Sequence, residues 1–463
     1  MPFHAGRITF CRFRITGDAP TSVDDTALSI LREHAFRETE VGAPDEVEVG
    51  WTTGQHLLDT QFTYEKNGFG DAGSGGGAML LAAMRIDTHK VPADVKQAYR
   101  QINEQAAASG NPSGYASKAQ KQEASELAGR QIHEDLAAGK YRKSKLVPVL
   151  WDLRRGALYC GATGNVVQEQ LARLLRASFA VELEPLSAGS LAGDILRSEG
   201  RRRDWEDLHP SPFTPAPPEA HAAMDDADAV NTDPTIPTIP WRAQAVDLKD
   251  FLGNEWLIWL WHLTETAEGV VSVAGGGESA RSGGGGGDGG GEAYITIDRS
   301  LDMDCAWGVR GKQTLRTGVT AGPISLIRLP EAGEALVTGK WPRKLGLILA
   351  DAECQWELTL QGDRLHVSSA ALPEVADAQT PRELTEARLM LVQRLAATLD
   401  GMYATFLDER TSSAWPTRRE TIAAWIRHRR IPAIPATHAT HAPAAHTPST
   451  SATPAAALQL TNA

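Results

Sequence analysis

Apolar residues along the chain follow two spacings, one typical of strands and one typical of helices. Runs in which alternate residues are apolar, or which are apolar throughout, predict strands at residues 7–15, 79–87, 146–153 and 157–160. Apolar residues three or four positions apart predict helices that begin near Pro92, Asn165 and Thr380. Because strands that can pair through short turns are followed by helices, we expect an α+β fold with mixed, largely antiparallel sheets and packed helices.

The spacing of apolar residues also predicts which side chains of each helix are buried. We expect Asn165 to cap the second helix, with Gln168 completing a capping box. The buried stripe of that helix is expected to be Val167, Leu171, Leu174, Leu175 and Phe179. The corresponding stripe of the helix after Pro92 is expected to be Val95, Tyr99, Ile102 and Ala106. The most apolar stretch, residues 251–263, is too short for a membrane span of roughly 20 residues and is assigned to the core.

Stretches of low complexity divide the chain into four parts. The proline-rich and acidic interval 204–240 is predicted to be a linker between two α+β units. These units are expected at residues 1–203 and 241–430, and the second contains a glycine-rich loop at 275–291. Residues 431–463 consist mainly of Ala, Thr, Pro and His and are predicted to be a disordered tail.

The overall charge limits how this chain could meet nucleic acid. Its 463 residues carry a formal net charge of -12, so any DNA-binding surface requires cations gathered in one place. No signal peptide precedes the first strand, and we expect a soluble protein of the cytoplasm without a membrane partner. Its four cysteines contain no CxxC pair, which favours buried reduced thiols over a zinc site or disulfides.

Motifs for catalysis and for cofactor binding are not found in the sequence. His133-Glu134 lacks the second histidine of HExxH, and neither a G-x-S-x-G elbow nor a P-loop occurs. The turn 161–164 lies between a strand and a helix but lacks the lysine expected of a phosphate site. Asp302 and Asp304 are interpreted as part of a solvated face. We therefore expect no enzyme activity, no cofactor and no metal.

Two groups of basic residues run against the acidic average. The first lies around the strand at 146–153 and consists of Lys140, Tyr141, Arg142, Lys143 and Lys145, together with Arg154 and Arg155 on the following turn. The second consists of Arg418, Arg419, Arg427, Arg429 and Arg430. Cations interleaved with aromatic residues can grip a phosphate backbone, so these residues are the predicted DNA contacts. A solvated surface is the alternative interpretation of each cluster taken singly.

Several segments occur in the order seen in a known family. They are Trp151-Asp152-Leu153, the run 156–163, a helix ending in Leu174-Leu175-Arg176, Pro185-Leu186, and the segment 251–261. In these segments the chain resembles the RdgC family of recombination-associated proteins, as a divergent and longer member. The resemblance implies sequence-independent binding of duplex DNA by a ring-shaped dimer that restrains a recombinase. It also implies that basic residues line the ring, and Tyr141, Arg142, Lys143 and Lys145 match that segment by position.

The leading hypothesis is therefore a non-enzymatic, sequence-independent DNA-binding protein of recombination or replication. Its expected partners are double-stranded DNA, a second copy of the chain and a recombinase, and its expected location is the nucleoid in the cytoplasm. One alternative is a protein-interaction module that does not bind DNA, and another is an enzyme with an unrecognised site. The salt dependence of binding distinguishes the DNA-binding protein from the interaction module, because affinity for DNA phosphates falls steeply as the salt concentration rises.

Overall fold

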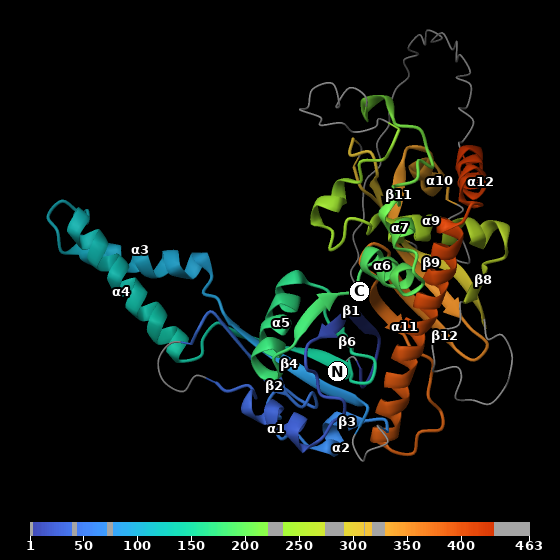
Figure 1. Ribbon diagram of the computed structural model, residues 1–463. Helices are drawn as coiled ribbons and strands as arrows, with labels where there is room; N and C mark the ends of the chain where they lie inside the picture. Colours follow the sequence, from blue (N-terminus) through green and yellow to red (C-terminus); the bar gives the residue numbers. More distant parts are fainter. Residues whose placement is uncertain are drawn as a thin grey trace, which may run out of the picture. The chain divides into compact units, whose positions relative to one another are not determined.

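The computed structural model in Figure 1 describes residues 3–38, 44–71, 77–220, 235–273, 291–309, 311–316 and 329–429. The predicted glycine-rich loop, apart from Gly291, and the predicted tail lie outside these residues. Within them the chain has the α+β fold that the apolar pattern predicts, with antiparallel pairing between all its named strands.

A single sheet runs through both halves of the described chain. Its first half consists of β1 (Ile8–Thr16), β2 (Val47–Thr52), β3 (Gly68–Phe69), β4 (Met79–His89), β5 (Arg142–Asp152), β6 (Ala157–Cys160) and β7 (Glu182–Pro185). The second half consists of β8 (Val270–Val273), β9 (Gly291–Cys305), β10 (Gln313–Arg316), β11 (Lys340–Ala350), β12 (Gln355–Gln361) and β13 (His366–Ala371). The strand order is β10-β9-β11-β12-β13-β1-β6-β5-β4-β2, so β1 and β13 join the two halves.

Helices pack on both faces of this sheet (Figure 1). Those before residue 210 are α1 (Asp25–Glu33), α2 (Tyr64–Asn67), α3 (Ala93–Ser109), α4 (Lys118–Ala137), α5 (Asn165–Phe179), α6 (Ala188–Ser198) and α7 (Arg202–Glu206). Those after it are the 3-10 helix η1 (Pro240–Gln244), α9 (Phe251–Thr266), α10 (Pro330–Val337), α11 (Pro381–Thr411) and α12 (Trp415–His428).

Helix α5 buries most of the stripe that its sequence predicts. Leu171, Leu174, Leu175 and Phe179 are all buried against one face of strands β1, β4, β5 and β6. The ring of Phe179 meets that of Trp151 edge to face, with centroids 5.2 Å apart. The cap differs from the prediction, because Gly164 occupies the N-cap and Asn165 is the first helical residue.

Helices α9 and α11 belong to the larger core cluster, which includes the second half of the sheet. Residues 251–263 form the buried part of α9, as their apolar composition predicts. Helix α11 begins at the Thr380 cap expected from the sequence, and its Asp400 accepts two hydrogen bonds from the buried Arg12 of β1 at 2.6 and 2.7 Å. Among the described helices, none combines the length and apolar character required for crossing a bilayer.

The interval expected to be a linker differs from that expectation where it is described. Residues 204–220 and 235–240 pack against the rest of the chain, and the contacts group Met1–Arg430 into one compact unit. Phe213 is 2% exposed and meets Trp341 and Trp415 edge to face. A few large apolar side chains therefore anchor a segment whose proline content suggested an unattached chain.

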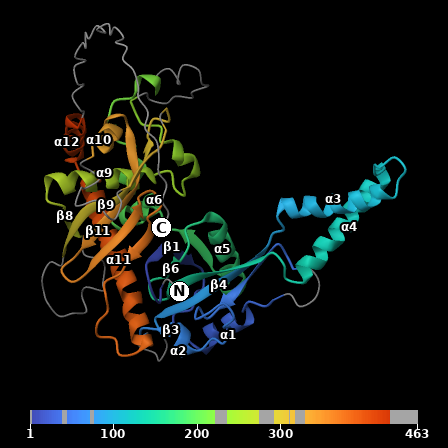
Figure 2. The ribbon, with the colours of Figure 1, turned by 180° about the vertical axis from the view of Figure 1, so that it is seen from behind.

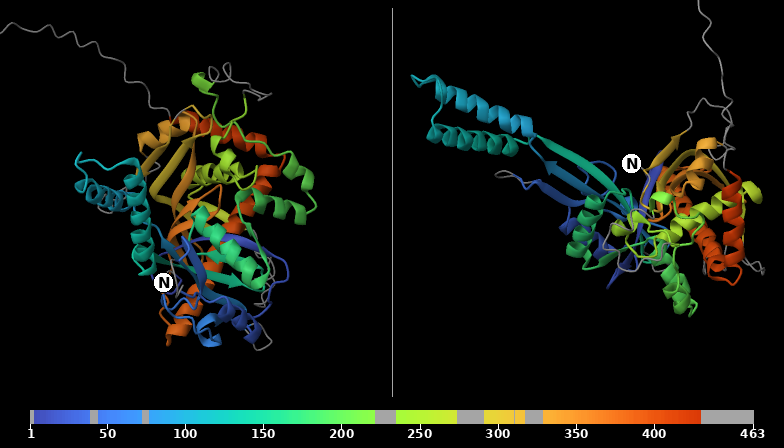
Figure 3. Two further views of the ribbon diagram at one scale, coloured as in Figure 1. Left: turned by 90° about the vertical axis from the view of Figure 1, so that its left-hand side faces the viewer. Right: turned by 90° about the horizontal axis from the view of Figure 1, so that it is seen from above.

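Helices α3 and α4 form a hairpin that leaves the sheet at the ends of β4 and β5 (Figures 2 and 3). Tyr99 of α3 donates a hydrogen bond to Asp135 of α4 at 2.6 Å, and the two helices pack mainly on each other. No residue of α3 is buried, and Ile102 of the predicted buried stripe is 59% exposed. The apolar stripe therefore reaches a partner helix but no core.

Candidate nucleic-acid interface

The first basic group lies where α4 passes into β5. Strand β5 begins at Arg142, four residues before the predicted start, so most of the basic segment is strand. Tyr141 precedes it with a left-handed φ of 64° and turns the chain out of the hairpin. Because side chains alternate along a strand, Arg142 and Ser144 point to one face and Lys143 and Lys145 point to the other.

Lys140 and Tyr141 are both engaged by one carboxylate. The Lys140 ammonium lies 2.5 Å from Asp135, and the Tyr141 hydroxyl donates to the same carboxylate at 3.4 Å. The hydrogen bonds from Lys140 and Tyr99 lower the pKa of Asp135, and the bond to Asp135 raises the pKa of Lys140. The positive charge of Lys140 is therefore balanced locally.

Arg142 is also paired with carboxylates. Its guanidinium lies 2.8 Å from Glu38 and 3.9 Å from Asp87, which is fully buried. Arg85 binds both of these carboxylates, and the hydrogen bonds from Arg85 and Arg142 lower the pKa of Glu38. Arg142 thus closes a charged network at the end of the sheet, and its removal would disturb the fold as well as the surface.

Lys143 and Lys145 remain as exposed cations. No hydrogen bond or ion pair of either ammonium group is found among the described residues, and the two residues stand opposite Thr88 and Ile86 of β4. They continue the face that Val147 begins, beyond the part of that face that the helices cover. This pair is the part of the first group best able to meet an external phosphate.

Arg154 and Arg155 lie at the opposite end of β5. The strand has 11 residues, so roughly 30 Å separates them from Lys143. The backbone N–H groups of both arginines donate to Asp152, and the Arg155 guanidinium lies 3.5 Å from the same carboxylate. The structure therefore does not bring this turn together with the basic segment before β5.

The second basic group lies on and beside α12. Arg418 pairs with Glu409, Arg419 lies 2.9 Å from Glu420, and Arg427 is exposed without a partner in the described chain. Arg429 pairs with Glu265 and stacks over the Trp425 ring at 4.5 Å, and burial lowers its pKa to about 10. Arg430 lies outside the described residues. Arg418 and Arg429 therefore tie α12 to its neighbouring helices α11 and α9.

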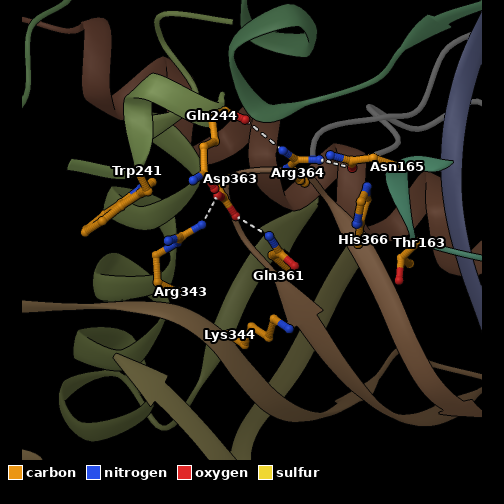
Figure 4. A pocket seen from close by; sticks show the side chains of 10 residues that line it. All are labelled: Thr163, Asn165, Trp241, Gln244, Arg343, Lys344, Gln361, Asp363, Arg364 and His366. Carbon is orange, nitrogen blue, oxygen red and sulfur yellow. Dashed lines mark hydrogen bonds and ion pairs between the residues drawn. The ribbon is translucent and has the colours of Figure 1, made fainter. Parts of the chain in front are cut away.

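A second cationic site, not predicted from the sequence, surrounds the turn 161–164. Figure 4 shows a pocket lined by Thr163 of this turn and Asn165 at the start of α5, by Lys344 of β11 and His366 of β13, and by Arg364 of the turn between β12 and β13. Because no lysine follows this turn in the sequence, a phosphate site is not expected there from sequence alone. The fold supplies a lysine from β11, about 180 residues later, and no local sequence signal could reveal that approach.

Within the described ranges, no three His, Cys, Asp or Glu side chains gather closely enough to hold a metal ion. Asp304 lies 3.7 Å from both Lys312 and Arg343, so it forms ion pairs rather than remaining a free surface carboxylate.

Comparison with known proteins adds no assignment to this geometry. No protein-family model and no curated protein matches the sequence.

Proposed function

We propose that this chain is a non-enzymatic protein that binds duplex DNA without regard to sequence and acts in recombination or replication. The observation that carries the proposal is the pair Lys143 and Lys145, exposed and unpaired within the described residues on one face of β5. Two such ammonium groups can neutralise phosphates and release counterions, which requires no contact with the bases. The resemblance to the RdgC family supports the same function.

The proposal includes a homodimer that encloses DNA and restrains a recombinase at the nucleoid. The hairpin of α3 and α4 supports a protein partner, because Ile102 is 59% exposed and Tyr115 is 80% exposed. These side chains equally suit the alternative of a protein-interaction module without DNA binding. Sedimentation velocity of the intact chain tests the dimer directly, since a monomer at micromolar concentration contradicts a closed ring.

The test of DNA binding is a mobility shift with several unrelated duplexes at a series of salt concentrations. The variant is Lys143→Ala with Lys145→Ala, and the control Arg202→Ala with Arg203→Ala removes the same charge from exposed positions outside the predicted contacts. Each lost phosphate contact reduces the magnitude of the slope of log K against log salt by about 0.9. The slope measured for the double variant should therefore be smaller in magnitude by about 1.8 per protomer.

The possible results separate the two hypotheses. Equal affinity for all duplexes, with a shallower salt slope in the lysine variant alone, supports the proposal. Failure of the intact chain to shift any duplex at low salt refutes DNA binding and favours the interaction module. Equal losses in the variant and the control would show that general charge, rather than the end of β5, attracts DNA.

A further inference from the structure

The pocket beside α5 joins segments that lie far apart in the sequence. It has a volume of about 310 Å³ and lies between the turn before α5, helix η1, and strands β11, β12 and β13. Pockets that hold small ligands begin at about this volume. Strand β1 separates β6 from β13 in the sheet, so the pocket depends on the pairing that joins the two halves.

Three of the four charged residues that line the pocket are cations. The lining includes Arg343, Lys344 and Arg364, and its one carboxylate is Asp363. Asp363 is already satisfied, because it accepts hydrogen bonds from Arg343 at 2.6 Å and from Gln361 at 3.0 Å. Lys344 is exposed and has no partner within the described residues, so its ammonium faces the pocket uncompensated. The balance of the lining favours an anion.

His366 provides an independent indication of a ligand. Its side chain is 8% exposed and lines the pocket, yet it has no hydrogen-bond partner among the described residues (Figure 4). Burial lowers the pKa of His366 to about 4, so at neutral pH the imidazole is uncharged and can donate one hydrogen bond. Since the imidazole lines the pocket, an oxygen of a bound ligand is a suitable acceptor for this hydrogen bond.

The start of α5 adds a third attraction for negative charge. This helix has 15 residues, and its Gly164 cap provides no side-chain acceptor for the first-turn N–H groups. Such a helix end favours anions through its dipole and its free N–H groups. Arg364 is held over this end, where it donates to the Asn165 side chain at 3.0 Å and to the Gln244 carbonyl at 2.7 Å.

We propose that this pocket binds the phosphate group of a small phosphorylated ligand. Lys344 and Arg364 supply the charge, while Thr163 and His366 supply neutral hydrogen bonds. Phosphate suits this set because it offers several strong acceptor oxygens and charge-assisted bonds to arginine and lysine. The site is independent of Lys143 and Lys145 and does not rest on the proposed DNA binding.

The experiment is isothermal titration calorimetry of the full chain with inorganic phosphate and with pyrophosphate. Lys344→Glu reverses a lining charge that has no ion-pair partner in the described part of the chain, and Lys121→Glu makes the same change at an exposed position of α4 as a control. Losing a charge-assisted bond and gaining a repulsion should weaken pyrophosphate binding by about tenfold or more, and the control should stay within about twofold. Circular dichroism of both variants confirms that they fold.

Competition with a short duplex identifies the source of the phosphate. Pyrophosphate binding that Lys344→Glu weakens and that duplex DNA does not displace supports a small-ligand site. Displacement by the duplex, together with weaker DNA binding of Lys344→Glu, would assign the pocket to a backbone phosphate and overturn the small-ligand proposal. Lack of pyrophosphate binding at millimolar concentration, or equal binding by Lys344→Glu, overturns the site altogether, whatever the mobility shift shows.

Discussion

Phe213 offers a sharp test of the core, because it lies in a segment whose composition suggested a linker. It is 2% exposed, and its ring centroid lies 5.5 Å from that of Trp341 and 6.3 Å from that of Trp415. Truncating a buried phenylalanine removes its transfer free energy and leaves a cavity, so Phe213→Ala should reduce the free energy of unfolding by about 3–5 kcal/mol. The same substitution in an unattached linker would change it by less than about 0.5 kcal/mol.

Urea unfolding followed by near-ultraviolet circular dichroism measures this difference, because both partner rings are tryptophans. Leu58→Ala is the control, since this side chain is apolar but 68% exposed and should lose less than about 0.5 kcal/mol. A loss below about 1 kcal/mol for Phe213→Ala, with an unchanged tryptophan signal, would refute the packing described for residues 204–220.

Two further predictions concern buried charge. Arg410→Met should reduce the free energy of unfolding by about 3–5 kcal/mol, because it leaves the fully buried Glu255 carboxylate without the guanidinium that lies 2.6 Å away. A loss under about 1 kcal/mol in urea unfolding would contradict this. Burial lowers the pKa of both His262 and His366 from 6.5 to about 4. Below pH 6.5 these two histidines therefore bind protons in the unfolded chain but not in the folded chain. As the pH is lowered from 6.5 to 4, the free energy of unfolding should decrease by about 1.4 kcal/mol per pH unit for each histidine. Unfolding at pH 7 and pH 5 checks this, and replacing both histidines with glutamine should flatten the dependence; an equally steep dependence in that variant would contradict the assignment.

The elements that could be predicted from the sequence are those whose bounds and buried residues depend on local spacing and composition. The stripe of α5, the Thr380 cap of α11 and the buried residues 251–263 follow from spacing and composition alone. Spacing could not show which surface covers a stripe, so Ile102 was expected to be buried, although α3 packs mainly on α4 and this side chain is 59% exposed. The proline content of residues 204–240 likewise suggested a linker, although a few apolar side chains, including Leu208 and Phe213, are enough to anchor the described part of this segment to the core.

The candidate sites could be predicted even less well, because local sequence does not show which distant residues lie beside them. The sequence locates the basic segment before β5, but it does not show that Glu38 and Asp135 balance Arg142 and Lys140. The folded structure is needed to distinguish these two paired cations from Lys143, whose ammonium has no partner in the described part of the chain. The pocket beside α5 could not be predicted at all, because its lining comes from residues that are distant along the chain and adjacent only across the sheet.

The pairing of β1 with β13 also has consequences for synthesis. Ile8 lies opposite Ala370, so the first strand of the sheet meets one of its neighbours only after more than 350 further residues have been made. Closing so long a loop is slow, and a nascent chain emerges from its N-terminal end. Until then, β1 can pair with β6 and β7 but presents an open edge where β13 belongs. The newly made chain is therefore most exposed to aggregation just before β13 emerges from the ribosome, and this is the stage at which a chaperone would protect it most.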